Sequence, residues 1–131
     1  MVVVDASVVV AAILGHARAR DLLDQEEVHV PPHVDLEVVS ALRRLVRTGA
    51  ETRESAVDAL RTWRRLAVRR HIALSHLARI WTLRVNVTAY DAAYLALAEA
   101  LGCDLVTADS RLARAPGATC AVRVLPRTTS A

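Results

Sequence analysis

Leu105-Val106-Thr107-Ala108-Asp109, late in the chain, has the same pattern as Val2-Val3-Val4-Asp5 at its beginning: a short run of aliphatic and β-branched residues followed closely by an acid. A continuous apolar run of this kind is typical of a strand in a parallel sheet, which is buried on both faces. In open α/β sheets, the groups at the carboxyl ends of such strands converge on one crevice. The two runs therefore predict that Asp5 and Asp109 lie at the same edge of a sheet.

The rest of the chain alternates short apolar runs with longer helical patterns, which indicates an α/β fold with a largely parallel sheet. Its 131 residues are close to the usual size of one domain and are long enough to bury a core. We expect one domain over residues 1–131, with a loose tail after residue 126. The predicted strands are 2–4, 28–30, 71–74, 105–107 and 121–125, and the predicted helices are 8–14, 17–25, 34–47, 51–68, 75–83, 88–101 and 109–115.

The composition limits the classes of protein that the chain can belong to. An apolar fraction of 53% excludes a disordered chain, and aromatic residues make up only 3%, with no Phe. This scarcity argues against sheets that bind RNA by stacking bases on surface aromatic residues. The formal charge is +3 and every basic residue is Arg, which fits an anionic partner. Neither the two Cys nor the five His show metal-ligand spacing, so we expect core or ordinary surface roles for them.

No segment predicts a membrane span. The longest apolar run, residues 6–14, is far shorter than the ~20 residues that a spanning helix needs. The sequence begins directly with a strand pattern and shows no basic leader. We therefore expect a cytoplasmic protein with no membrane partner.

Four acids are candidate site residues, and each has a plain structural alternative. Asp5 and Asp109 each follow a strand and could cap the next helix. Asp91 follows Thr88 by three residues, as in a capping box. Glu37 could be a first-turn acid that the helix dipole favours. Taken singly, each acid fits its structural alternative.

Taken together, the four acids predict a metal site. Asp91 lies on a helix that is apolar nearly all round, where a carboxylate is costly to bury unless its charge is offset. Four carboxylates in one pocket would repel each other, and the chain has no Lys to supply a positive charge. Oxygen ligands without Cys or His suit Mg²⁺, or Mn²⁺ as a substitute, rather than Zn²⁺. Such an ion assists phosphodiester cleavage by polarising a phosphoryl oxygen and lowering the pKa of water.

Two blocks of sequence resemble the PIN-domain ribonucleases. The first is Val2-Val3-Val4-Asp5-Ala6-Ser7 with Glu37-Val38-Val39-Ser40-Ala41-Leu42-Arg43-Arg44. The second is Thr88-Ala89-Tyr90-Asp91-Ala92-Ala93-Tyr94-Leu95-Ala96-Leu97-Ala98, followed by Leu105-Val106-Thr107-Ala108-Asp109. The length and layout are similar to those of VapC-type toxins of bacterial toxin–antitoxin pairs, and the resemblance runs over nearly the whole chain.

This resemblance implies a three-layer α/β/α sandwich around a mostly parallel sheet of four to five strands. It also implies a Mg²⁺-dependent endoribonuclease, with Asp5, Glu37, Asp91 and Asp109 as the catalytic and metal-binding acids and Asp5 and Asp91 as the principal ligands. Ser7 and Thr107 match positions whose hydroxyls support the site. The implied partners are an RNA substrate such as transfer or ribosomal RNA, a cognate VapB-type antitoxin that blocks the pocket, and a second copy in a homodimer.

Other residues near the predicted crevice are assigned by position. Arg84 and Asn86 precede the helix that carries Asp91, so we expect them to contact substrate. Asp35 stands two positions before Glu37, and two residues so spaced on a helix point to different sides. We favour Glu37 as the site residue and leave open whether Asp35 shares its role.

Other functions fit the residues less well. A phosphate-accepting receiver domain uses a pair of acids at its first strand and a late Lys, and this chain has one Asp there and no Lys. A haloacid-dehalogenase-like phosphatase needs an Asp two residues after Asp5, where this chain has Ser7. A regulatory or protein-binding module without nuclease activity is the remaining alternative, against which the four intact acids argue.

Overall fold

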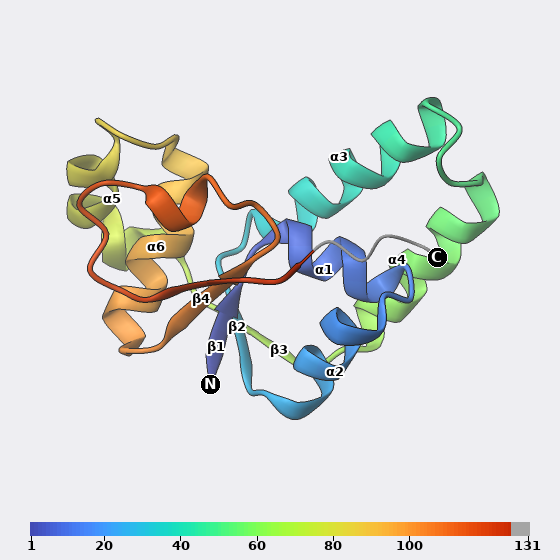
Figure 1. The fold of residues 1–131 in the computed structure, drawn as a ribbon, viewed down its shortest axis with the longest axis horizontal. Helices are drawn as coiled ribbons and strands as arrows, with labels where there is room; N and C mark the ends of the chain where they lie inside the picture. The colour runs from blue at the N-terminus through green and yellow to red at the C-terminus, as the bar shows by residue number, and fades with distance from the viewer. Residues whose placement is uncertain (127–131) are drawn as a thin grey trace.

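The computed structural model describes residues 1–126 and contains a five-stranded sheet in which every pairing is parallel (Figure 1). The strand order is β3-β2-β1-β4-β5, so the first strand of the chain lies in the middle. The strands are β1 (Val2–Val4), β2 (Val28–Val30), β3 (Val68–Arg70), β4 (Asp104–Thr107) and β5 (Val122–Val124).

Helices cover both faces of this sheet. They are α1 (Ala6–Ile13), α2 (Ala17–Gln25), α3 (Val34–Arg47), α4 (Arg53–Arg65), α5 (Leu77–Leu83) and α6 (Ala89–Leu101), with short 3₁₀ turns η1 (Ala73–His76) and η2 (Leu112–Arg114). In Figure 1, α5 and α6 lie on one side of the strands and α1, α2 and α4 on the other. Helix α6 packs on β1 and β4, while α1 packs on β4 and on three neighbouring helices. The predicted three-layer α/β/α sandwich is confirmed.

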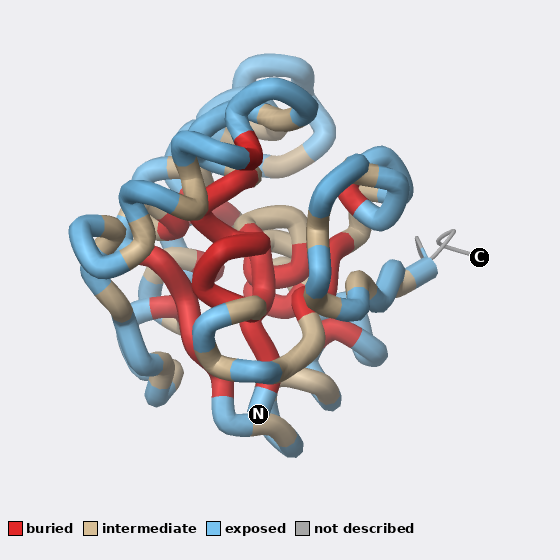
Figure 2. Tube along the Cα trace, turned by 90° about the vertical axis from the view of Figure 1, so that its left-hand side faces the viewer, coloured by how far each residue is buried: buried red, intermediate tan, exposed pale blue. Residues whose placement is uncertain are grey.

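The core forms where β1 and β4 meet α1 and α6. All three residues of β1 are buried, and α6 is buried continuously from Ala92 to Ala98. Small Ala side chains on α6 let the helix approach the sheet closely, and Leu95 and Leu97 fill the remaining space. Figure 2 shows these buried segments in the interior and exposed helical turns at the periphery.

The prediction for the region around β3 was wrong. The helix predicted over 51–68 ends at Arg65, and the strand predicted at 71–74 lies at 68–70. Val68 pairs with Val28 in this register. Because β3 is an edge strand, its other two residues are exposed arginines. The apolar residues of the predicted strand instead lie at the start of η1, where Ile72 is the N-cap and Leu74 is exposed. Arg69, in the middle of β3, pairs with Glu27.

Two further expectations concern the end of the chain and the membrane. The helix predicted at 109–115 is reduced to the single turn η2, and the tail predicted to be loose lies outside the described residues. Within residues 1–126, none of the helices is long and apolar enough to cross a membrane. Cytoplasmic residence stays a prediction.

Candidate active site

Asp5 lies at the carboxyl end of β1 and caps the start of α1. Its carboxylate accepts hydrogen bonds from the backbone N–H groups of Ser7 at 3.1 Å and Val8 at 3.3 Å. The residue is only 7% exposed. Burial raises the pKa of Asp5 above its ordinary value, while hydrogen bonds from the Ser7 and Thr107 side chains oppose that rise. The structural alternative therefore holds for this residue, and the capping acid also faces the predicted site.

Two hydroxyls join Asp5 to the end of β4. The side chains of Ser7 and Thr107 both donate to the Asp5 carboxylate. In the other direction, the Ser7 hydroxyl accepts from the N–H of Ala108 at 2.9 Å, and the Thr107 hydroxyl accepts from the N–H of Asp109 at 3.0 Å. The turn that carries Asp109 is thereby fixed to the end of β1.

Glu37 reaches the same region from the first turn of α3. Its carboxylate accepts a hydrogen bond from the buried hydroxyl of Tyr94 on α6 and lies 3.4 Å from the imidazole of His33. The His33 ring packs edge-on against the Tyr94 ring, with centroids 4.9 Å apart. Burial and the neighbouring Glu37 raise the pKa of Tyr94 far above its ordinary value, so this hydroxyl stays protonated and donating.

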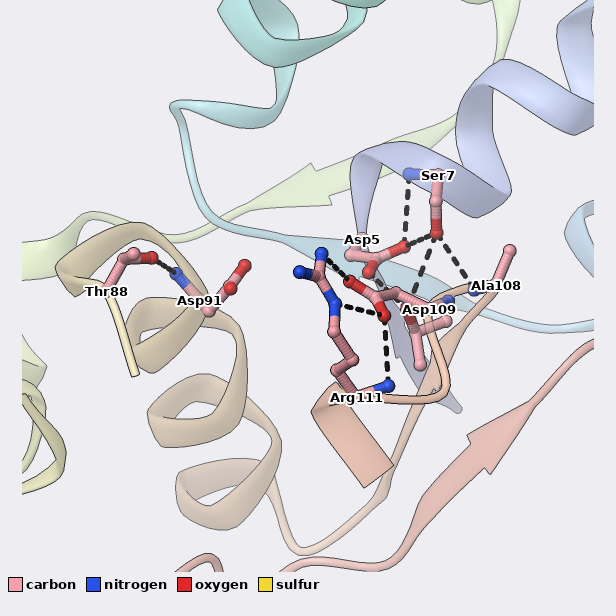
Figure 3. A network of polar contacts seen from close by, with 8 residues as sticks. Asp5, Ser7, Thr88, Asp91, Ala108, Asp109 and Arg111 are labelled. Carbon is pink, nitrogen blue, oxygen red and sulfur yellow. Dashed lines mark hydrogen bonds and ion pairs between the residues drawn. The ribbon is translucent and has the colours of Figure 1, made fainter. Parts of the chain in front are cut away.

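Asp91 lies in the first turn of α6, whose N-cap is Thr88 (Figure 3). Its backbone N–H donates to the Thr88 hydroxyl at 3.2 Å, which is half of the predicted capping box. The Thr88 side chain also hydrogen-bonds to the Asp91 carboxyl group, which opposes the rise in its pKa. Burial raises the pKa of Asp91, and the charges of Glu37 and Asp109 raise it further.

Asp109 follows β4 and is held by Arg111. The guanidinium donates to both carboxylate oxygens of Asp109, from Nε at 3.2 Å and from Nη2 at 3.0 Å, and the Arg111 backbone N–H adds a bond of 2.9 Å. Figure 3 shows the guanidinium on the side of Asp109 that faces Asp91. Although the chain has no Lys, Arg111 therefore supplies a positive charge to the cluster.

The four acids come from four separate elements and influence one another. The pKa values of Asp5 and Asp91 are both above their ordinary values. The charge of Asp91 contributes to the rise at Asp5, and the charges of Glu37 and Asp109 contribute to the rise at Asp91. This all-oxygen donor set suits a hard divalent cation. As the side chains stand, however, no three Asp, Glu, His or Cys residues within 1–126 are grouped closely enough to hold an ion. The set fits a metal in chemistry, but it is not fully assembled.

A cavity of about 900 Å³ opens beside the acids. Ser7, Glu37, Tyr90 and Ala108 line it where it borders the cluster. From there it runs between α1 and α3, where the lining is largely apolar. The lining residues there include Val10, Ala11, Leu14, Ala41 and Leu45. Of the four acids, Glu37 lines this groove, and the other members of the set have sequence neighbours in the lining. The groove is much larger than a single ion.

Arg84 and Asn86 make their contacts with residues other than the four acids. The Arg84 guanidinium lies over the Trp81 ring, 3.6 Å from its centroid, and donates to the Trp81 carbonyl at 2.6 Å. The Asn86 amide donates to the Pro116 carbonyl at 3.2 Å. Among the described residues, neither side chain contacts an acid of the cluster. Their role in substrate binding stays a prediction.

Asp35 has a different environment from Glu37. Its carboxylate accepts from the Trp63 indole N–H at 2.7 Å and from Arg70 at 2.8 and 3.0 Å. These bonds join α3 to α4 and to β3. Arg70 holds the pKa of Asp35 below its ordinary value. Asp35 therefore has structural partners on the side of α3 away from Tyr94.

Sequence reasoning missed His33 and Arg111 as neighbours of the acids. His33 was among the histidines expected to be ordinary, yet its Nε2 lies 3.4 Å from the Glu37 carboxylate and 3.1 Å from the Tyr90 carbonyl oxygen. A usable signal was its position four residues before Glu37, which puts both on one helix face. Arg111, two residues after Asp109, gave a similar local signal.

Comparisons with known proteins agree with this fold. The family model of the PIN domain matches residues 2–118. Ribonuclease VapC9 of Mycobacterium tuberculosis is 50% identical over 127 residues, which cover 97% of this chain and 100% of the relative. Ribonuclease VapC1 of the same species is 41% identical over 128 residues, covering 94% of this chain and 96% of the relative.

Two solved structures share the fold. The first is VapBC2 from Rickettsia felis bound to a DNA fragment from their promoter, with a TM-score of 0.67 and 14% identity, covering 95% of this chain and 98% of that one. The second is PAE2754 from Pyrobaculum aerophilum, with a TM-score of 0.64 and 23% identity over 94% of this chain and 83% of that one. On the family match and the identity to the mycobacterial relatives, the chain belongs to the PIN-domain family and, within it, to the VapC ribonucleases.

Proposed function

We propose that this chain is a metal-dependent endoribonuclease and the toxin of a VapBC-type toxin–antitoxin pair. Membership in the VapC ribonucleases supports the reaction class. The observation that carries the proposal is electrostatic. Besides burial, the charges of Glu37 and Asp109 raise the pKa of Asp91, and the charge of Asp91 raises the pKa of Asp5. Raised carboxyl pKa values clustered in a cleft mark functional sites in general.

We assign the roles as follows. Asp5 and Asp91 are the principal ligands of the metal, with Glu37 and Asp109 completing the set. Mg²⁺, with Mn²⁺ as a substitute, supplies Lewis-acid chemistry at the phosphate when bound. Ser7 and Thr107 orient Asp5 through their hydroxyls and fix the turn before Asp109. Glu37, oriented by Tyr94 and His33, is placed to take up a proton from the attacking water.

The proposed partners follow from the family. An RNA substrate, such as transfer or ribosomal RNA, meets the acids at the open end of the groove. A VapB-type antitoxin blocks the same end, and the largely apolar walls between α1 and α3 offer it a surface to bury. The complex of VapBC2 from Rickettsia felis has a related fold on its toxin side. A homodimer in the cytoplasm completes the proposal.

The test is cleavage of a structured RNA by the purified chain. We expect cleavage with Mg²⁺, loss of cleavage with EDTA, and no cleavage by Asp5→Asn or Asp91→Asn, each checked for folding by circular dichroism. Asp58→Asn is a matched control, because Asp58 is an exposed acid on α4. Equal cleavage by the wild type and both site variants would identify a contaminant. A folded wild type that binds partner protein but never cuts RNA would support a binding module instead.

A further inference from the structure

The Arg111 side chain supplies positive charge beside the acidic cluster. Its guanidinium binds both oxygens of Asp109 and its charge lowers the pKa of Asp91, so it interacts with two of the four acids. The side chain is 85% exposed. It is therefore held mainly by this ion pair rather than by packing, and exposed ion pairs are weak.

A divalent cation and the Arg111 guanidinium compete for binding to the Asp109 carboxylate. Both are positive, and both need the same carboxylate oxygens. At the few ångströms that separate groups bound to one carboxylate, like charges repel strongly wherever water is partly excluded.

We infer that Arg111 is a built-in counter-cation that competes with the divalent metal for Asp109 and, once displaced, binds a phosphate of the nucleic acid. The inference rests on the proposed metal site. A guanidinium released from Asp109 stays near the acids, because Arg111 is only two residues further along the chain. Its planar fork of donors matches a phosphate as well as it matches a carboxylate.

The competition is tested by titrating Mg²⁺ into the full chain and following the melting temperature. We compare the wild type with Arg111→Gln, which keeps length and polarity, and with Arg111→Lys, which keeps the charge. The control is Arg114→Gln, because Arg114 is an exposed arginine of the neighbouring turn η2. We expect the Mg²⁺ midpoint of Arg111→Gln to fall by about two- to fivefold, the range for loss of an exposed ion pair. The Arg111→Lys midpoint should stay nearer that of the wild type.

The phosphate contact is tested with a fluorescent mixed-sequence DNA 12-mer, whose backbone phosphates serve as the probe. Replacing one phosphate-binding arginine lowers the slope of log affinity against log salt by about one. We expect this loss for Arg111→Gln in Mg²⁺ but not in EDTA, where Arg111 is bound to Asp109. Arg114→Gln should show no such dependence on Mg²⁺.

The outcomes separate this inference from the proposed function. A wild type that binds Mg²⁺, with Arg111→Gln binding it no more tightly, overturns the competition and leaves the metal site intact. A salt slope that Arg111→Gln leaves unchanged in Mg²⁺ overturns the phosphate contact. A wild type whose melting temperature does not respond to Mg²⁺ overturns the metal site and the inference together.

Discussion

The hydroxyl of Thr107 donates a hydrogen bond to the carboxylate of Asp5, although the two residues are 102 positions apart in the chain. Both are buried, and Thr107 is fully so. The same hydroxyl accepts from the N–H of Asp109. The Thr107 side chain therefore joins the carboxyl end of β1, at Asp5, to the turn after β4 that carries Asp109.

Thr107→Val should destabilise the protein by about 1–3 kcal/mol, because a buried carboxylate loses one of its donors while the side-chain shape is kept. Urea unfolding measures this. Thr82→Val is the control, because Thr82 is exposed on α5 and its hydroxyl bonds only to a carbonyl of its own helix. Equal urea midpoints for the wild type and Thr107→Val would mean that the hydroxyl does not stabilise Asp5.

The strands β1 and β4 were predictable because burial on both faces makes a strand read as a continuous apolar run. Asp5 and Asp109 follow those runs directly, so their shared edge could be predicted as well. Asp91 and Glu37 required a second signal, namely acids beside the apolar stripe of a helix. In each case the information is local to a few residues of the sequence.

The edge strand β3 and the counter-ion could not be predicted in this way. Val68 is the only apolar residue of β3, since an edge strand needs no apolar run, and its pairing with Val28 is a contact between distant segments. Whether Arg111 turns toward Asp109 or toward solvent is a matter of rotamers and charge. Asp35 and Glu37 look alike in sequence, and only tertiary contacts with Trp63 and Tyr94 distinguish them.

Glu37→Gln should therefore affect RNA cleavage, whereas Asp35→Asn should affect the stability of the fold. We expect Glu37→Gln to lower RNA cleavage by at least about tenfold, as for loss of an acid–base group, with little change in stability. Asp35→Asn should keep cleavage and lose about 0.5–1 kcal/mol, because its partly exposed ion pair with Arg70 is screened by solvent. Cleavage rates and urea midpoints of both variants decide the matter. Loss of cleavage in Asp35→Asn without unfolding would show that Asp35 shares the role of Glu37.

The sign of the Asp35 contribution can also be tested with pH. Its folded pKa is lowered, so its stabilisation is present above the unfolded pKa and is lost as the pH falls through the folded one. The difference in stability between the wild type and Asp35→Asn should therefore shrink as the pH falls below the unfolded pKa of about 3.9 and vanish below the lowered folded value. A difference that persists unchanged in acid would assign the effect to packing instead of charge.

Asp91→Asn should stabilise the metal-free protein. The folded pKa of Asp91 is raised, so its contribution to stability is complete below the unfolded pKa and is lost as the pH rises through the folded one. At neutral pH the ionised carboxylate is therefore unfavourable, and Asn removes the repulsion from Glu37 and Asp109. We expect a gain of ~0.5 kcal/mol after allowance for solvent screening, or about 2 °C in melting temperature.

With Mg²⁺ present, the wild type should become more stable than Asp91→Asn. Binding to the native state raises the melting temperature of the wild type, and the variant lacks a principal ligand and should respond less. Asp58→Asn should follow the wild type with and without Mg²⁺. A variant that is less stable than the wild type in EDTA would contradict the repulsion inferred from the raised pKa.

A histidine pair outside the site, with one buried and one half-buried ring, should make the protein less stable in mild acid. His29 on β2 is 4% exposed, and its Nε2 lies 2.8 Å from a Glu27 carboxylate oxygen. A carboxylate can only accept, so His29 carries its proton on Nε2 and its Nδ1 accepts from Nε2 of His71, 2.7 Å away. If both rings are protonated, His29 Nδ1 and His71 Nε2 both carry a hydrogen, and the hydrogen bond between them is lost.

The direction of the effect follows from His71. Burial lowers the pKa of His71 below its ordinary value, and the nearby charges of His29, His76 and Arg69 lower it further. Stability is therefore complete above the unfolded pKa, about 6.5, and is lost as the pH falls through the lowered folded value. We expect the urea midpoint of the wild type to fall between about pH 7.5 and about pH 5.5. His71→Gln should lose much of that pH dependence, while His16→Gln, at an exposed position after α1, should keep it. The same loss in His71→Gln as in the wild type would place the acid sensitivity elsewhere in the fold.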